Sequence, residues 1–312
     1  MKLIYILSSA HSGSTILDLT LGANPPFCSS GEQRYLPWQL ERTATSGGSL
    51  EQQTICTCLK QFRECGYWKN VFEIIRKKTD IDICTAPRRF PISFFGKFAY
   101  KDLGSFPQRV AGKLARHLLQ LDVVPRRLAV APPHLSAILK NNWILYEAMA
   151  EASGRPFVVD SSKDITRALL LHKDRPDKIV FLFISRGVYG YVNSMMNQGL
   201  SLEEAVRRKD NYSAMVNQVK RNVKGLNYYE ISYESFVKYP VQFLTEFCTF
   251  LDIPADINEQ MKNGILDTRT MHLVAGNPTR YRGKMQLRLD EKWRNSLTEQ
   301  QIMKINRLTK HS

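Results

Sequence analysis

The sequence has no hydrophobic run long enough to cross a membrane. No segment approaches the roughly 18 continuous apolar residues that a transmembrane helix needs. A secretory leader is not evident either, because the first stretch typical of a strand begins at residue 3 and leaves no room ahead of it. If the sequence is complete, these two absences lead us to expect a cytoplasmic protein.

Cysteine is scarce, with six in 312 residues, which argues against a secreted disulfide scaffold. Three of the six, Cys56, Cys58 and Cys65, lie within ten positions of one another, and such a group raises the question of zinc. A structural zinc site is closed by a tetrahedral ligand set, yet no further ligand follows at a familiar spacing and no histidine is near in the sequence. We therefore expect a packing or redox role for these cysteines, with their state left open, and no metal site.

Acidic residues are outnumbered, with 29 Asp and Glu against 44 Lys and Arg. The net charge of +15 implies an anionic partner, such as a nucleotide cofactor, an acidic acceptor, nucleic acid or a lipid surface. No basic motif interleaved with aromatic residues is present, so we expect no nucleic acid as partner.

Residues 79–134 lack a clear periodicity and are interrupted by prolines. We expect a single domain over residues 1–312 with an acceptor-binding insertion at about 79–134. The alternatives are that this insertion touches a membrane surface as a peripheral contact, or simply packs on the core. Nothing in the sequence indicates the oligomeric state.

The N-terminus reads as a strand, a turn of small residues and a helix. Residues 1–7 are apolar and rich in β-formers, residues 8–15 are small or polar apart from His11, and a helix follows until Gly22. Amides in such a turn can point inward, and the helix dipole favours negative charge at its N-terminus. This stretch therefore predicts an anion-binding site.

The second half alternates strands and helices. A short strand at 157–160 precedes a turn that holds Lys163, and the continuous apolar run at 178–185 predicts an interior strand that ends at Arg186. Carboxyl ends of parallel strands are where open α/β sheets bind ligands, so Lys163 and Arg186 are candidates for anion contacts. Lys163 is equally well explained as a solvated side chain in a helix-capping turn. The pattern predicts an α/β fold with a central parallel sheet flanked by helices.

Four sets of residues resemble the sulfotransferase family, which implies a three-layer, P-loop-like fold. They are the turn Ser12-Gly13-Ser14-Thr15, the pair Gly31-Glu32, the strand-end Arg186 with Ser194 eight positions later, and the C-terminal Arg282-Gly283-Lys284. The family usually has Lys or Arg two residues before the glycine of the turn, where this chain has His11. The resemblance covers roughly residues 1–38 and 157–295.

What the resemblance implies is transfer of a sulfuryl group from 3′-phosphoadenosine 5′-phosphosulfate (PAPS), without a metal, to a hydroxyl or amine of an acceptor that is a glycan or another small molecule. It assigns Glu32 as the general base. For this reaction, Lys163 at its strand end, together with His11, would stabilise charge as the sulfuryl group leaves. The residues that it assigns to cofactor binding are His11, Ser12, Gly13, Ser14, Thr15, Arg186, Ser194, Arg282, Gly283 and Lys284. Glu32 could instead be a helix-start residue, and His272, beside the C-terminal segment, is the rival base.

Two other classes remain open. A P-loop kinase or nucleotidase would have Gly-Lys-Ser/Thr in its turn, whereas Ser14 follows Gly13 here. The strand at 180–184 also ends in Ser185-Arg186 and not in the aspartate that would hold Mg²⁺. The second alternative is a non-catalytic module that binds a nucleotide or glycan without a working base.

Overall fold

A computed structural model describes residues 1–42, 55–94, 133–223 and 225–309. The strands are β1 (Lys2–Leu7), β2 (Phe27–Ser29), β3 (Phe157–Asp160), β4 (Ile179–Ser185), β5 (Tyr228–Ser232), β6 (Ile265–Asp267) and β7 (Lys284–Gln286). The α-helices are α1 (Ser14–Gly22), α2 (Leu36–Arg42), α4 (Gly66–Thr79), α6 (Pro133–Ser153), α7 (Ile165–Asp174), α8 (Val188–Met196), α9 (Leu202–Asn222), α10 (Tyr233–Lys238), α11 (Pro240–Phe250), α12 (Glu259–Lys262), α13 (Trp293–Ser296) and α14 (Glu299–Thr309). Short 3₁₀ turns are η1 (Gln33–Tyr35), η2 (Pro87–Arg89), η3 (Pro176–Lys178), η4 (Thr268–Thr270) and η5 (Pro278–Tyr281).

Five strands form the central sheet in the order β2-β3-β1-β4-β5, and every neighbouring pair is parallel. The first strand of the chain is therefore the middle strand, with Leu3 in register with Val158 on one side and Ile179 on the other. The apolar strand β4 is interior, as predicted, because it pairs with both β1 and β5. These pairings confirm the predicted α/β fold with a parallel sheet.

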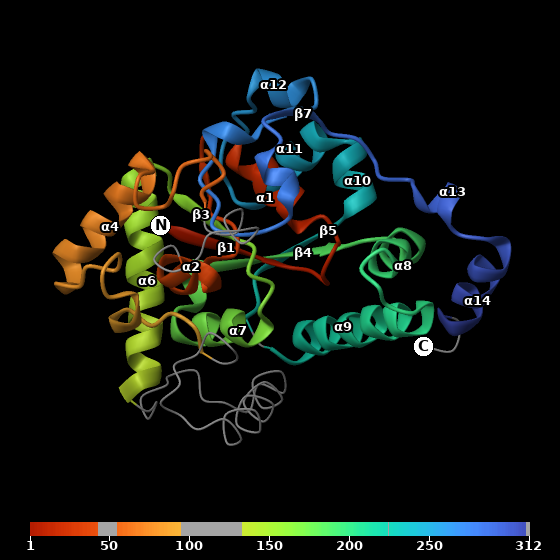
Figure 1. The fold of residues 1–312 in the computed structure, drawn as a ribbon, viewed down its shortest axis with the longest axis horizontal. Coiled ribbons are helices and arrows are strands. Elements are labelled where there is room, and N and C mark those ends of the chain that lie inside the picture. The colour runs from red at the N-terminus through yellow and green to blue at the C-terminus, as the bar shows by residue number, and fades with distance from the viewer. Residues whose placement is uncertain (43–54, 95–132, 224, 310–312) are drawn as a thin grey trace.

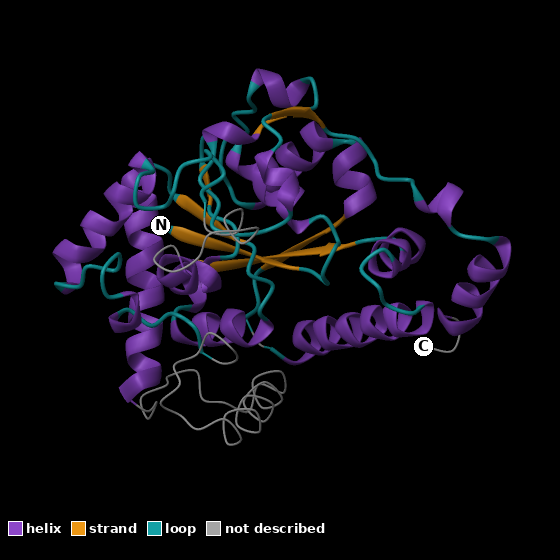
Figure 2. Ribbon diagram, in the orientation of Figure 1, coloured by secondary structure: helices purple, strands orange, loops and turns teal. Residues whose placement is uncertain are grey.

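Side-chain alternation along β1 divides the core into two layers. Leu3, Tyr5 and Leu7 belong to the layer that includes buried residues of α4, α6, α7 and α9. Ile4 and Ile6 belong to the layer with α1, α10 and α11. Helices accordingly cover both faces of the sheet (Figures 1 and 2). Burying both faces explains why β1 and β4 read as continuous apolar runs.

Several predicted elements are confirmed with small shifts at their ends. The strand expected at 157–160 is β3, and the apolar run at 178–185 forms β4, which begins one residue later. Further along the chain, Ser201 caps α9 by accepting a hydrogen bond from the Glu204 amide. Pro240 occupies the first position of α11, directly after α10. Among the described residues, no helix is both long and apolar enough to span a membrane.

The predicted acceptor-binding insertion at 79–134 lies for the most part outside the described residues. The described part packs on the core: Phe90 and Ile92 are fully buried, and the Ile92 carbonyl accepts hydrogen bonds from Asn142 and Arg167. This part of the segment therefore has a structural role.

Because the five strands are parallel, the segments that follow β1, β2, β3 and β4 start at the same edge of the sheet. These segments contain the predicted anion-binding turn, Glu32, Lys163 and Arg186, in that order. Residues separated by up to about half the chain are brought together at this edge.

Candidate active site

The anion turn, residues 8–15, joins β1 to α1. His11 and Gly13 both have positive φ, 58° and 88°, so the backbone alternates in hand as it does in anion-binding nests. A Cβ on Gly13 would lie 2.4 Å from the Tyr233 ring, so the glycine is required by packing as well as by backbone conformation. Within the described part of the chain no side chain caps α1, and its first turn has no acidic residue, so its N-terminal amides are open to an anion.

Glu32 and Lys163 form an ion pair at the edge of this turn. The Lys163 Nζ donates to Glu32 Oε1 at 2.6 Å and to the Ser14 hydroxyl at 3.4 Å. The two side chains are only 12% and 19% exposed, respectively. A carboxylate and an ammonium group thus lie together beside the first residue of α1.

The segment that holds Glu32 is fixed by a buried aspartate in α1. Asp18 accepts hydrogen bonds from the Ser29 hydroxyl at 2.6 Å, the Ser161 hydroxyl at 2.6 Å and the Gly31 amide at 3.0 Å. Burial raises the pKa of Asp18 to about 7, against the lowering effect of these hydrogen bonds. Asp18 was not among the predicted site residues, although a lone carboxylate within the apolar run Ile16–Leu21 is a signal that could have found it.

A second buried network fixes the turn that holds Lys163. Asp160, at the end of β3, accepts from the Ser162 amide at 2.7 Å and the Tyr146 hydroxyl at 2.7 Å, and Arg167 Nη2 lies 3.5 Å from it. Asp164 caps α7 by accepting from the Arg167 amide. The helix-capping interpretation of this turn is therefore confirmed, but Lys163 itself is paired with Glu32 and not solvated.

Asp160 bears on the nucleotidase alternative, because the sequence argument against a magnesium-binding aspartate considered only the strand at 180–184. β3 is a neighbour of β1 and does end in one, where a nucleotidase would place a magnesium-binding residue. The Asp160 carboxylate is fully buried, and its two oxygens accept from Ser162 and Tyr146. It is therefore occupied by protein donors.

Arg186 reaches the anion turn from the end of β4. Its Nη1 donates to the His11 carbonyl at 3.0 Å, its Nη2 lies 3.0 Å from Asp290 Oδ2, and its guanidinium stacks 4.7 Å from the centre of the Tyr233 ring. The side chain is 8% exposed, and its Nε has no hydrogen-bond partner among the described residues. A buried donor without a partner is suited to a ligand oxygen.

Positive charge converges at this turn. Burial lowers the pKa of His11, and the charges of Lys163 and Arg186 lower it further. The positive potential of Lys163 and Arg186, which disfavours a protonated His11, would favour an anion bound among these three side chains.

The other predicted cofactor residues are dispersed. Ser12 exchanges a hydrogen bond with Ser9 at 2.7 Å, and Thr15 accepts one from the Asn277 amide at 3.1 Å. Ser194 lies partly buried in α8, and no hydrogen bond among the described residues joins it to Arg186.

The C-terminal segment predicted to bind the cofactor is only partly near the turn. Gly276 and Asn277 lie against Thr15. Arg282 and Lys284 are exposed, and Lys284 begins β7, which pairs with β6 in a small antiparallel sheet. Gly283, with φ 74°, hydrogen-bonds to Thr268 in the same unit. In this arrangement these three residues make no hydrogen bond or ion pair with the described residues of the anion turn.

A cavity of about 380 Å³ opens beside the turn, between α9 and the ends of three strands. Ser9, Ser185 and Ser232 line it at the strand ends, and Lys209 and Tyr212 line it from α9. The Tyr212 hydroxyl has no hydrogen-bond partner among the described residues. The volume is within the range of small-molecule sites.

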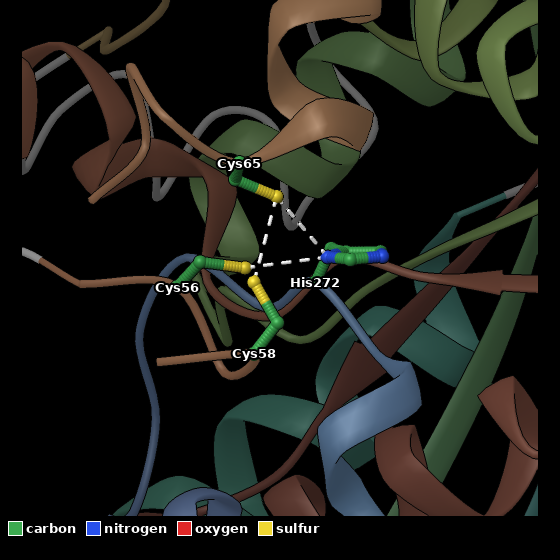
Figure 3. Close-up of side chains that lie close together, drawn as sticks. All are labelled: Cys56, Cys58, Cys65 and His272. Carbon is green, nitrogen blue, oxygen red and sulfur yellow. Dashed lines mark hydrogen bonds between the residues drawn. The ribbon is translucent and has the colours of Figure 1, made fainter. Parts of the chain in front are cut away.

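His272, the rival base, lies in a different cluster. Its Nδ1 is 3.2 Å from Cys65 Sγ and 3.5 Å from Cys56 Sγ (Figure 3). Its ring stacks on Tyr67. The sequence has no histidine near these cysteines, but the fold brings His272, 207 positions after Cys65, to their side, and sequence spacing gives no signal for that approach.

No protein-family model matches this chain, and no curated protein matches it. Among solved structures, it is similar to a sulfotransferase domain from the curacin biosynthetic pathway, with 17% identity and a TM-score of 0.48, over 99% of this chain and 97% of that one. A sulfotransferase domain from the Synechococcus PCC 7002 olefin synthase gives 16% and 0.44, over 97% and 92%. The sulfotransferase STF9 from Mycobacterium avium gives 14% and 0.41, over 84% and 67%.

Proposed function

We propose that this chain is a sulfotransferase that moves a sulfuryl group from PAPS to a hydroxyl or amine group of an acceptor, such as a glycan or another small molecule. The observation that carries the proposal is the Glu32–Lys163 pair beside the anion turn, with Lys163 Nζ 2.6 Å from the carboxylate and 3.4 Å from Ser14 Oγ. Sulfuryl transfer needs a proton acceptor and a cation at one place, and this pair supplies both.

The donor has two anionic groups, and the residues present suit both. The amides of the anion turn and the open N-terminus of α1 would bind the phosphosulfate. The guanidinium of Arg186, with its unpartnered Nε, would bind the 3′-phosphate, and the hydroxyl of Ser194 is the partner implied by the family resemblance. PAPS supplies the sulfuryl group and a leaving group that requires no metal.

In the transfer step, the oxygen of the acceptor hydroxyl bonds to sulfur while the Glu32 carboxylate accepts the proton of that hydroxyl. Lys163 stabilises the negative charge on the bridging oxygen as its bond to sulfur breaks. His11, held beside Lys163 and Arg186, adds a hydrogen-bond donor to the same anion. His272 is directed at cysteine sulfurs, which favours Glu32 as the base.

The kinase alternative is less well supported, because Ser14 replaces the phosphate-binding lysine and protein donors occupy Asp160. Calorimetry in magnesium-free buffer separates the classes: we expect binding of adenosine 3′,5′-bisphosphate and weak binding of ATP. Sulfur-labelled PAPS with a panel of hydroxyl and amine acceptors should then yield labelled product. Magnesium-dependent ATP hydrolysis without bisphosphate binding would identify a nucleotidase, and bisphosphate binding without any labelled product would identify a non-catalytic module.

A further inference from the structure

Four potential metal ligands converge outside the candidate active site. The sulfur atoms of Cys56, Cys58 and Cys65 and a ring nitrogen of His272 all lie within 4.8 Å of one another (Figure 3). Cys56 and Cys65 are fully buried, and Cys58 and His272 are partly buried. Among the described residues, this is the group whose composition fits a metal ion.

The spacing of these atoms matches a tetrahedral zinc site. Zn–S bonds of about 2.3 Å and Zn–N bonds of about 2.0–2.1 Å at tetrahedral angles place two sulfurs about 3.8 Å apart and a sulfur and a nitrogen about 3.6 Å apart. Here Cys58 and Cys65 Sγ are 3.6 Å apart, and His272 Nδ1 is 3.5 Å from Cys56 Sγ and 3.2 Å from Cys65 Sγ. These three separations are within about 0.4 Å of the values that a bound ion would set, and all four ligand atoms lie within 4.8 Å of one another.

The local backbone is built to present the sulfurs together. Residues 55–61 form a tight turn, in which Ile55 bridges to Gln61 and the Cys56 amide donates to the Lys60 carbonyl at 2.9 Å. Leu59 sits at the tip with φ 66°, a strained conformation for a large side chain, and it is 49% exposed. Cys65 is then the N-cap of α4, where the helix dipole favours a thiolate.

We propose that Cys56, Cys58, Cys65 and His272 bind one Zn²⁺ ion in a closed, structural Cys₃His site. Cysteine sulfur and imidazole nitrogen are the ligands that zinc prefers in such sites, and four protein ligands leave no position for a reacting group. The rival is a Cys58–Cys65 redox pair. A disulfide would involve two of the four residues and would leave the approach of Cys56 and His272 without a purpose.

This zinc site would hold residues 272–274 next to the loop that contains Glu32, the proposed base. The Trp68 indole donates to the His272 carbonyl at 3.1 Å, and the Leu273 amide donates to the Thr57 hydroxyl at 3.2 Å. One residue further, the Val274 amide donates to the Ser30 carbonyl at 3.0 Å, two positions before Glu32. The ion would thus hold residues 272–274 against the loop that presents Glu32, without touching the reaction.

The first test is the metal content of the full chain, purified without chelator, by mass spectrometry. We expect about one zinc per chain, reduced at least about tenfold in Cys65→Ser because a closed site loses a ligand. Cys84→Ser, which removes a partly buried cysteine outside the cluster, is the matched control and should keep its zinc. Equal zinc in both variants, or a wild-type chain that neither contains nor takes up Zn²⁺ after reduction, would overturn the proposal.

A ligand swap covers the case in which Cys65→Ser fails to fold. His272→Cys keeps a four-ligand set and should retain zinc, whereas His272→Ala should lose it and unfold at a lower temperature. Cobalt(II) bound to the wild type should show the visible absorption of tetrahedral thiolate coordination. A Cys58–Cys65 disulfide in zinc-free wild-type protein would establish the redox pair instead. None of these readouts depends on sulfuryl transfer, so the proposed function can fail independently.

Discussion

The anion turn and the cysteine cluster are built in opposite ways. The turn is one contiguous stretch, residues 8–15, whose amides and hydroxyls are positioned by the strand before it and the helix after it. The cluster joins a turn at 56–65 to His272, 207 positions beyond Cys65. A contiguous site can be recognised from its spacing, whereas a site assembled across the chain becomes visible only when the fold brings its parts together.

The two sites nevertheless share one segment. Two residues after His272, the Val274 amide donates a hydrogen bond to the Ser30 carbonyl. Three residues further, the Asn277 amide donates one to the Thr15 hydroxyl in the anion turn. Residues 272–277 therefore link the cysteine cluster to the anion turn. Substitutions at the two sites can still be told apart by the quantity that each one changes: turnover, ligand affinity or stability.

The largest effect is expected for Glu32→Gln, because it removes the proposed proton acceptor and keeps the side-chain shape. A general base contributes on the order of 10²–10⁴ in rate, so turnover should fall by that factor while affinity for adenosine 3′,5′-bisphosphate is retained. Turnover with labelled PAPS and calorimetry on the same preparations measure both quantities. Glu41→Gln, at a carboxylate paired with Arg88 on the surface, is the control.

The same experiment with His272→Ala distinguishes the two sites. If His272 is part of the cluster, its loss should lower stability and any bound zinc, with turnover falling only as the folded population falls. Normal turnover in Glu32→Gln, together with a folded, ligand-binding but inactive His272→Ala, would instead make the histidine the base.

The sheet was predictable because both its faces are buried. The apolar runs at 1–7 and 178–185 predict interior parallel strands, and they form β1 and β4. The strand-end positions of Lys163 and Arg186 followed from the same reasoning. The contact between Glu32 and Lys163 could not be predicted in this way, because it depends on the conformations of the two loops that follow β2 and β3.

The supports of the site were not predictable from local pattern. Asp18 lies within the apolar run of α1 and Asp160 ends β3, and each accepts a hydrogen bond from a hydroxyl on another segment. Nothing in the sequence near His272 indicates its approach to the cysteines, so the sequence alone leaves it as a rival base. In each case the missing information was the position of a distant side chain.

A smaller effect is expected for Arg186→Ala. Loss of a desolvated, charge-assisted contact should weaken bisphosphate binding by roughly 2–4 kcal/mol, which is roughly 30- to 800-fold. The affinity of Arg186→Lys should lie between those of the wild type and Arg186→Ala, because lysine keeps the charge and loses the planar fork of the guanidinium. Calorimetry measures the affinities, and Arg175→Ala, at an exposed ion pair with Glu147, controls for the loss of surface charge. Unchanged affinity in Arg186→Ala would remove this residue from the proposed 3′-phosphate site.

The smallest effect is expected from Asp18, which supports the segment that holds Glu32 through hydrogen bonds from Ser29, Gly31 and Ser161. Its pKa is about 7 in the folded chain, raised from an ordinary value of 3.8 by burial and further by the charge of Asp160. Between these two values the folded state keeps a proton that the unfolded state has released. The free energy of unfolding should therefore fall as pH rises from about 4 to about 7, by at most about 1.4 kcal/mol per pH unit from this group.

Asp18→Asn removes this titration while keeping an amide that can accept and donate hydrogen bonds near Ser29 and Ser161. The free energy of unfolding of the variant, relative to wild type, should then increase between about pH 5 and about pH 7, as measured by urea denaturation at each pH. Asp256→Asn, at an exposed carboxylate after α11, should show no such trend. A wild-type minus variant difference that is the same at both pH values would mean that Asp18 is ionised throughout this range, held as a carboxylate by its three donors.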